Sequence, residues 1–256
     1  MIVRERENEF IMIEQHNHAL TSGDIMSHWK DSLFHGKANR KSVETAIYMH
    51  DYGWKEFDKQ PFWNDQTQAP YTFSDFPTYP KIILYAHGIN EVEKKDMYAA
   101  LLCSEHYTRF LLNHTSVEAQ SFVTEEKKRQ KRILKSLGNI DKLLFRFHYG
   151  LLQLGDNLSL FLCLNEPGVA KEKEHHFFKH GIPLASSIEG VNQSTLGVEW
   201  IDNQTVSVHE FPFDQAFTVA FNQKKVSKAS IKELGLINAY EEASSEKVTV
   251  QLVPEP

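Results

Sequence analysis

Residues 143–165 read LLFRFHYGLLQLGDNLSLFLCLN, and this stretch decides the fold class that the sequence predicts. Apolar residues recur through it at helical spacing with few charges between them, so it should form a helix that is buried on most of its sides. Pro167 and Gly168 follow and break the helix. We therefore expect this segment to be the central core helix of a helical domain.

One carboxylate, Asp156, lies within the most apolar part of this helix. Leu152, Leu158 and Leu160 are its apolar neighbours, and Leu152, Leu160 and Leu164 stand at helical spacings from it. A carboxylate that faces an apolar core is costly unless a cation or a hydrogen-bond donor compensates for it. Metal ligation is one such compensation, so Asp156 is a candidate ligand.

Further helices are predicted upstream of the core helix, over residues 15–29, 42–49, 80–95, 97–113 and 117–137. The second of these ends at the sequence HDYGW, where Gly53 is expected to adopt the left-handed conformation that stops a helix. Residues 60–80 contain four prolines and many aromatic residues. This composition predicts a long irregular loop, and such loops are often functional.

The pattern changes after about residue 185. The stretches LGVEWID, TVSVHEF, FTVAFN and KVTVQLV are rich in β-branched residues and nearly alternate, which predicts strands. A short helix precedes the last of them, and FIMI near the N-terminus resembles a short strand-like lead. The expected fold is mainly α, a helical bundle with a small C-terminal antiparallel β-sheet. We expect a helical domain over residues 1–185 and a small antiparallel α+β appendage over residues 186–256 that packs on it.

The composition excludes several classes of protein. The 256 residues carry a formal net charge of -6, so no basic surplus indicates a nucleic-acid partner. The longest apolar run, 158–164, is too short to span a bilayer, so no membrane partner is expected. Cys103 and Cys163 lie far apart in apolar patterns and should be buried free thiols. With a charged N-terminus that does not resemble a secretory signal, this indicates a cytoplasmic protein.

The strongest chemical signal is the adjacent pair His50 and Asp51 at the end of a predicted helix. The chain has 13 histidines, and several of them fall near carboxylates. Imidazole nitrogens together with carboxylate oxygens suit Mn, Fe, Co, Ni or Zn better than Ca or Mg. The pattern therefore predicts a site for one or two divalent transition-metal ions.

The order His, then His-Asp, then Asp resembles the HD-domain superfamily of metal-dependent phosphohydrolases. The matching positions are His18, His50, Asp51 and Asp156. More narrowly, the motifs QHNHALTSGDIMSHW, IYMHDYGW, LLCSEHY and QLGDNLSLFLC together resemble an uncharacterised HD-like bacterial family, known only as a domain of unknown function. The resemblance spans roughly residues 10–165 and extends loosely into the C-terminal strands. It implies an HD-like, all-helical metal-binding core, and it supplies no substrate.

Two-metal members of that superfamily have additional histidines between the His-Asp pair and the final Asp. His106, in LLCSEHY, is the candidate for this role. His87 matches no such motif and precedes a glycine, so it is either a ligand or a histidine at a helix end. His16 and His18 are two residues apart and cannot face the same side of a helix. The motif favours His18.

Two other polar residues near these motifs, Arg109 and Asp58, each allow two interpretations. Arg109 follows His106 by three residues and shares its helical face, so it could hold an anionic group in catalysis or form a surface ion pair. Asp58 could accept a hydrogen bond from a ligand imidazole or be an ordinary surface residue.

These features favour a metal-dependent hydrolase that acts on a phosphoester or a similar anionic small molecule. Asp51 is the expected bridging or water-orienting ligand, because a carboxylate has two oxygens. Two alternatives stay open: a non-haem di-iron oxygenase on the same scaffold, and a non-enzymatic metal- or ligand-binding module. The sequence does not specify the oligomeric state.

Overall fold

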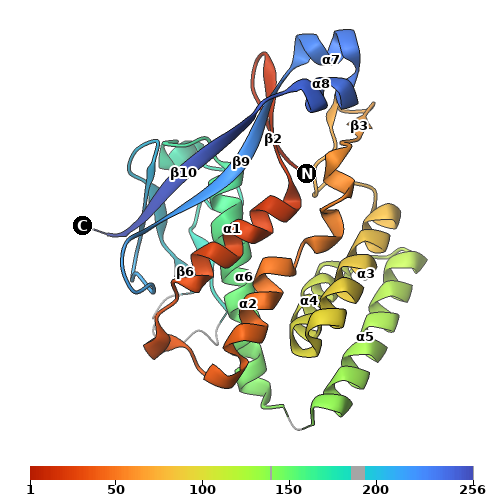
Figure 1. Cartoon of the computed structure of the whole chain (residues 1–256), viewed down its shortest axis with the longest axis vertical. Coiled ribbons are helices and arrows are strands. Elements are labelled where there is room, and N and C mark those ends of the chain that lie inside the picture. The colour runs from red at the N-terminus through yellow and green to blue at the C-terminus, as the bar shows by residue number, and fades with distance from the viewer. Residues whose placement is uncertain (139, 186–193, 256) are drawn as a thin grey trace.

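The computed structural model describes residues 1–138, 140–185 and 194–255. A group of long helices lies beside a six-stranded sheet, and two short helices lie beyond the end of the long strands (Figure 1). The helices are α1 (Gln15–Ser27), α2 (Arg40–Met49), α3 (Thr78–Lys95), α4 (Met97–Leu111), α5 (Val117–Leu137), α6 (Lys142–Leu164), α7 (Lys228–Leu234) and α8 (Leu236–Glu242). The strands of the large sheet are β1 (Ile2–Glu5), β2 (Glu9–Ile13), β7 (Val198–Trp200), β8 (Thr205–Val208), β9 (Phe217–Ser227) and β10 (Ser245–Pro254).

The prediction of a mainly α, all-helical core with a small C-terminal antiparallel sheet is wrong. The large sheet has the strand order β1-β2-β9-β10-β8-β7, so the N-terminal segment supplies two of its strands. β2 pairs antiparallel with β9, and β10 pairs in parallel with β8, which makes the sheet mixed. Two smaller sheets pair β3 (Trp63–Asn64) with β4 (Ala69–Pro70) and β5 (Ile182–Pro183) with β6 (Thr195–Leu196).

The long strand β9 forms because its side chains alternate between two environments. Phe217, Val219 and Phe221 are buried, whereas Thr218 and Asn222 are exposed. This period of two places the apolar side chains on the face toward the helices. The ring of His28, which follows α1, stacks on Phe217 with ring centroids 4.0 Å apart. The sheet is thus joined to the helix that carries His18.

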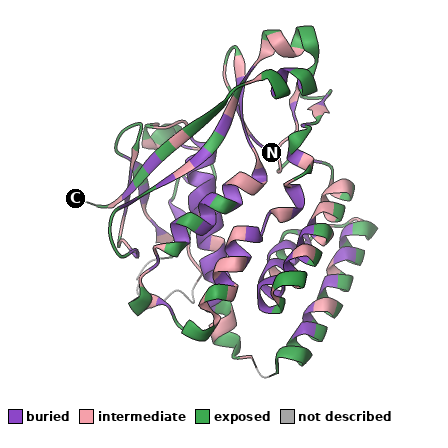
Figure 2. Ribbon diagram, viewed as in Figure 1, coloured by how far each residue is buried: buried purple, intermediate pink, exposed green. Residues whose placement is uncertain are grey.

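Helix α6 is the buried helix of the core, with fifteen of its residues enclosed. Figure 2 shows the buried residues concentrated where the helices face one another and the sheet. Gly155 allows this close packing, because a Cβ there would lie 2.7 Å from Cγ of Met26 and 3.3 Å from Cγ2 of Ile47. Because Gly155 has no side chain, α1 and α2 can pack directly against α6 beside Asp156.

Gly53 has a different role from the expected one. Its backbone is not in the left-handed region, and α2 ends at Met49 before a short 3-10 helix, η3 (Tyr52–Trp54). A Cβ at Gly53 would lie 2.0 Å from the backbone oxygen of Leu84 on α3. The glycine is needed because η3 and α3 touch backbone to backbone.

Three further expectations concern the domain boundary, the two cysteines and membrane-spanning helices. The proposed domain boundary at 185–186 adjoins residues 186–193, which lie outside the described part of the chain, and it stays a prediction. Cys103 and Cys163 are free and buried, which confirms that expectation. None of the described helices has the length and apolar character needed to cross a membrane.

Candidate metal centre

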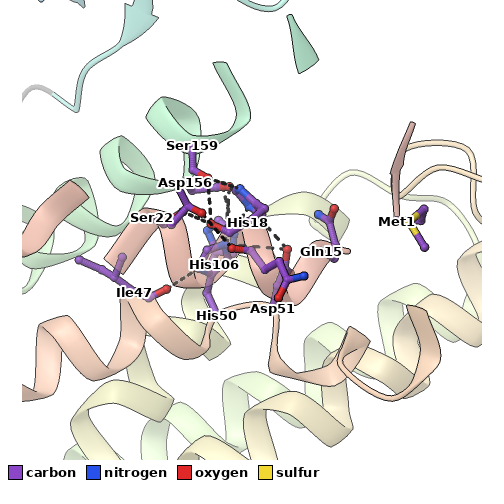
Figure 3. Close-up of polar contacts among 12 residues, drawn as sticks. Met1, Gln15, His18, Ser22, Ile47, His50, Asp51, His106, Asp156 and Ser159 are labelled. Carbon is purple, nitrogen blue, oxygen red and sulfur yellow. Dashed lines mark hydrogen bonds and ion pairs between the residues drawn. The ribbon is translucent and has the colours of Figure 1, made fainter. Parts of the chain in front are cut away.

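The structure brings together five side chains that the sequence singles out. His18 lies on α1, His50 directly follows α2 as its C-cap and is followed by Asp51, His106 lies on α4, and Asp156 lies on α6. All five are buried. Figure 3 shows these side chains turned toward one another between the helices. Four separate segments of the fold therefore converge on one point.

The distances between the polar atoms are short. Nε2 of His18 lies 3.3 Å from Nε2 of His50 and 3.1 Å from Oδ1 of Asp156. Asp156 also lies 3.6 Å from His50 through Oδ1 and 3.5 Å from Nε2 of His106 through Oδ2. Oδ2 of Asp51 lies 3.8 Å from Nε2 of both His18 and His50. Each histidine thus directs the same nitrogen, Nε2, at the carboxylates.

The outer nitrogens of two rings are held by hydrogen bonds that fix their protonation. Nδ1 of His50 lies 2.7 Å from the carbonyl oxygen of Ile47, so Nδ1 must be the donor. Nδ1 of His18 lies 2.9 Å from Oγ of Ser159, whose own proton goes to the carbonyl oxygen of His18. Nδ1 of His18 therefore donates as well. In their neutral forms both rings present an Nε2 lone pair to the centre.

Asp51 is held by Tyr107. The Tyr107 hydroxyl lies 2.6 Å from Oδ1 of Asp51 and 2.5 Å from the carbonyl oxygen of His50. The Tyr107 ring stacks on Tyr85 with centroids 3.9 Å apart, which limits its movement. Because Oδ1 is engaged by the phenol, Oδ2 is the Asp51 oxygen that faces the histidines.

The charges in the centre depend on one another. Burial alone would lower the pKa of His50, but Asp51 and Asp156 outweigh burial and raise this pKa to about 9. Burial would raise the pKa of Asp156, yet its hydrogen bonds with His18 and His50 hold that pKa well below the usual range. Burial lowers the pKa of His106 to about 4. The centre thus favours ionised carboxylates balanced by positive charge.

The donor set fits a metal ion. His18, His50 and Asp51 form one group with ligand atoms within 4.8 Å of one another, and His50, His106 and Asp156 form a second. His50 belongs to both groups, so the centre could hold one ion or two. Nδ1 of His106 is buried and has no hydrogen-bond partner among the described residues. No hydrogen bond at Nδ1 therefore fixes the orientation of this ring. The donors are imidazole nitrogen and carboxylate oxygen, as transition metals prefer.

Two other candidate histidines lie outside these groups. His87 is exposed in the middle of α3, so the expectation of a helix-end histidine is wrong. His16 packs edge-on against Tyr52 with ring centroids 5.4 Å apart, and its buried Nδ1 has no partner. Burial, followed by the nearby Lys55, lowers the pKa of His16 to about 4.

Arg109 lies outside the cluster. Its Nε donates to Oε1 of Glu105 at 2.8 Å, and its guanidinium lies over the Tyr149 ring at 4.6 Å from the centroid. The same Tyr149 ring also lies near the His106 ring, with centroids 6.3 Å apart. Arg109 therefore forms the surface ion pair that was its alternative reading, and its catalytic role stays a prediction.

Asp58 is neither exposed nor bonded to a ligand imidazole. Its carboxylate accepts from the backbone N–H of Gln15 at the start of α1 and from the amino group of Met1. Burial raises the pKa of Asp58, and the Met1 amine opposes that rise. It therefore fixes the N-terminal end of the helix that carries His18.

Sequence reasoning missed two residues that position ligands, Tyr107 and Ser159. Tyr107 directly follows His106 in LLCSEHY, and Ser159 follows Asp156 by three residues on α6. The spacing of three residues places Ser159 on the same helical face as Asp156, so the sequence alone could have indicated that Ser159 lies near the site. Nothing in the local pattern pairs Tyr107 with Asp51, because the two are 56 residues apart.

A comparison with protein families gives one match. The family model described as "Protein of unknown function (DUF3891)" matches residues 1–228. Neither a curated protein nor a solved structure matches the chain. The expectation of an uncharacterised domain-of-unknown-function family is confirmed, while membership of the HD-domain superfamily stays a prediction.

Proposed function

The chain belongs to the family described as protein of unknown function (DUF3891), and from the geometry of its buried centre we propose a metal-dependent hydrolase. Its substrate class would be a phosphoester or a similar anionic small molecule. His18, His50, Asp51, His106 and Asp156 are the proposed ligands. Mn, Fe, Co, Ni or Zn are the ions that this donor set suits.

One observation carries the proposal: the Nε2 atoms of three histidines converge on two carboxylates inside the fold. The outer nitrogens of His18 and His50 are already engaged, so their inner nitrogens, which lie 3.1 Å and 3.6 Å from Oδ1 of Asp156, could bind a cation in place of a proton. A divalent ion bound there would act as a Lewis acid and would lower the pKa of water.

Asp51 and Asp156 have different roles in the proposed reaction. Asp51 orients the attacking water through Oδ2, because Tyr107 holds Oδ1. Asp156 uses both oxygens toward the histidines and keeps them in place. The side chains of His18, His50 and His106 are 0%, 1% and 3% exposed, whereas those of Asp51 and Asp156 are 7% and 12% exposed. We therefore expect water and substrate to approach on the carboxylate side.

The test is turnover of a panel of phosphomonoesters and phosphodiesters by the purified chain with Mn, Co or Ni added. We expect hydrolysis that is abolished by chelator and by Asp51→Asn. Asp24→Asn, an exposed carboxylate on α1, is the matched control and should keep full activity.

Two outcomes would contradict a hydrolase. Iron-dependent consumption of oxygen without hydrolysis would indicate an oxygenase. A metal-loaded protein that turns over nothing in the panel, and that consumes no oxygen, would indicate a binding module.

A further inference from the structure

Two lysine ammonium groups lie over the ring of Tyr52, the residue that directly follows Asp51. The ammonium groups of Lys55 and Lys95 lie 5.5 Å and 5.7 Å from the centroid of the Tyr52 ring. His16 packs edge-on against the same ring. Three nitrogen-bearing side chains from α1, α3 and the segment after η3 therefore meet at one aromatic side chain.

The neighbouring carboxylates form their direct contacts with other groups. Glu56 pairs with Lys59 at 2.5 Å, and Glu91 pairs with Lys94 at 2.5 Å. Asp96, which follows Lys95, accepts from Ser42 Oγ at 2.7 Å and from the backbone of Ala99 at 2.8 Å. Among the residues that the structure describes, neither Lys55 nor Lys95 forms an ion pair.

This arrangement is unusual for surface lysines. Each segment holds one lysine that has a carboxylate partner and one that does not, and the two without a partner both lie over the Tyr52 ring. Like charges near one another repel, and a tyrosine ring compensates for only part of that cost. An anion bound by both ammonium groups would offset the repulsion.

The position of this cluster relates it to the metal centre. Tyr52 is fixed next to Asp51 because Gly53 touches the backbone of α3. His16 is fixed because α1 also carries His18. Asp51 is one of the two members of the centre with more than minimal exposure. The cluster is therefore held by the same two segments that carry His18 and Asp51.

We propose that His16, Tyr52, Lys55 and Lys95 form the subsite that binds the phosphate of a phosphomonoester. Two lysines match the double negative charge of a phosphomonoester near neutral pH, whereas a phosphodiester carries a single charge. Lysine binds phosphate as a point charge and tolerates different substrate shapes. The subsite selects monoesters over diesters. The selection of monoesters as substrates rests on the proposed hydrolase function, whereas phosphate binding does not.

The test measures binding of inorganic phosphate by calorimetry, using the whole chain both with metal and after chelation. We expect the double variant Lys55→Gln/Lys95→Gln to bind phosphate about tenfold more weakly, since each lost charge-assisted contact weakens binding. The matched control is Lys41→Gln/Lys131→Gln. It removes the same charge from two exposed lysines outside the cluster, and it should bind phosphate as the wild type does.

Kinetics supply a second measurement. With para-nitrophenyl phosphate, we expect the Lys55/Lys95 double variant to raise KM about tenfold with kcat little changed, because the lysines bind the substrate without reacting. Hydrolysis of a phosphodiester should change less than hydrolysis of the monoester.

The two proposals fail in different ways. If the protein binds no metal and hydrolyses no substrate, the proposed hydrolase function is contradicted. Phosphate binding to the chelated protein would still test the proposed phosphate subsite in that case. Three results would overturn the subsite. The wild type could show no saturable phosphate binding, the Lys55/Lys95 variant could bind as well as the wild type, or the control variant could lose as much.

Discussion

The Nε2 atoms of His18 and His50 face each other at 3.3 Å, and both rings use their other nitrogen elsewhere. Nδ1 of His18 bonds to Ser159, and Nδ1 of His50 bonds to the carbonyl of Ile47. Only one of the two facing nitrogens can carry a proton at this distance. A metal cation that replaces this proton would be shared by both nitrogens and balanced by the two carboxylates.

Replacing Tyr107 by Phe should weaken metal binding. The variant loses the hydroxyl that holds Oδ1 of Asp51, so the carboxylate can rotate. We expect the metal affinity to fall roughly tenfold to a hundredfold, as for other groups that orient a ligand. Metal titration measures this. Tyr85→Phe is the control, because it keeps the stacked ring and leaves the contact to Asp51 intact. Equal affinity in Tyr107→Phe and wild type would show that the phenol does not orient Asp51.

Ser159→Ala should have a smaller effect of the same kind. It removes the acceptor that fixes the His18 ring, so His18 can present the wrong nitrogen. We expect roughly tenfold weaker metal binding. Ser22→Ala is matched to it, because the Ser22 hydroxyl donates only to the His18 backbone carbonyl. If both serine variants weaken binding equally, the effect comes from helix packing and not from the imidazole.

Asp156→Asn should separate stability from metal binding. The carboxylate faces three histidines, and the amide keeps its shape without its charge. Added metal should raise the Tm of the wild type by about 5 to 10 °C, since a ligand that binds only the native state stabilises it. The variant should fold, and its Tm should hardly respond to metal or chelator. Thermal unfolding of both proteins with and without metal gives the answer. A full metal-dependent shift in the variant would exclude Asp156 as a ligand.

His148 should make stability depend on pH away from the metal centre. Its Nε2 donates to the carbonyl of His35 at 2.8 Å, and its Nδ1 accepts from the Tyr98 hydroxyl at 2.7 Å. Burial lowers the pKa of His148, and the His35 contact opposes that change. A base with a lowered pKa takes up its proton more readily when unfolded. Its contribution is therefore complete above the unfolded pKa of about 6.5 and is lost as the pH falls toward the folded pKa.

The measurement for His148 is the free energy of unfolding in urea between pH 8 and pH 5. His148→Gln should lose stability at high pH, and the difference from wild type should shrink as the pH falls. His87→Gln, on the exposed face of α3, should keep the wild-type profile. A difference between His148→Gln and wild type that stays constant with pH would show that His148 does not titrate in this range.

The site was more accessible to sequence reasoning than the fold. His50 and Asp51 are adjacent, and His106 and Asp156 each lie on a strongly patterned helix whose buried face can be read locally. Helix packing then brings those faces together. The sheet could not be inferred in this way, because Phe10 pairs with Val226 across more than two hundred residues. A strand's partner is set by the whole chain and not by its own pattern.

The charged residues show the same limit. Arg109 shares a helix with His106, yet its direction is set by Glu105 and Tyr149. Lys55 and Lys95 are unremarkable in the sequence, and only the structure shows that their neighbours leave them without carboxylates. Periodicity predicts which side of a helix faces inward, but it does not predict how flexible charged side chains pair on the surface.

The most direct test of the central claim is the metal content of the chain purified without chelator, measured by elemental analysis for the wild type, His50→Ala and Asp51→Ala. His50 belongs to both possible ligand groups, so its loss should affect every ion in the centre. We predict a transition metal at one or two ions per chain in the wild type, and loss of most of it in both variants. Full metal occupancy in both folded variants, or a wild type that takes up no transition metal when it is supplied, would contradict the account.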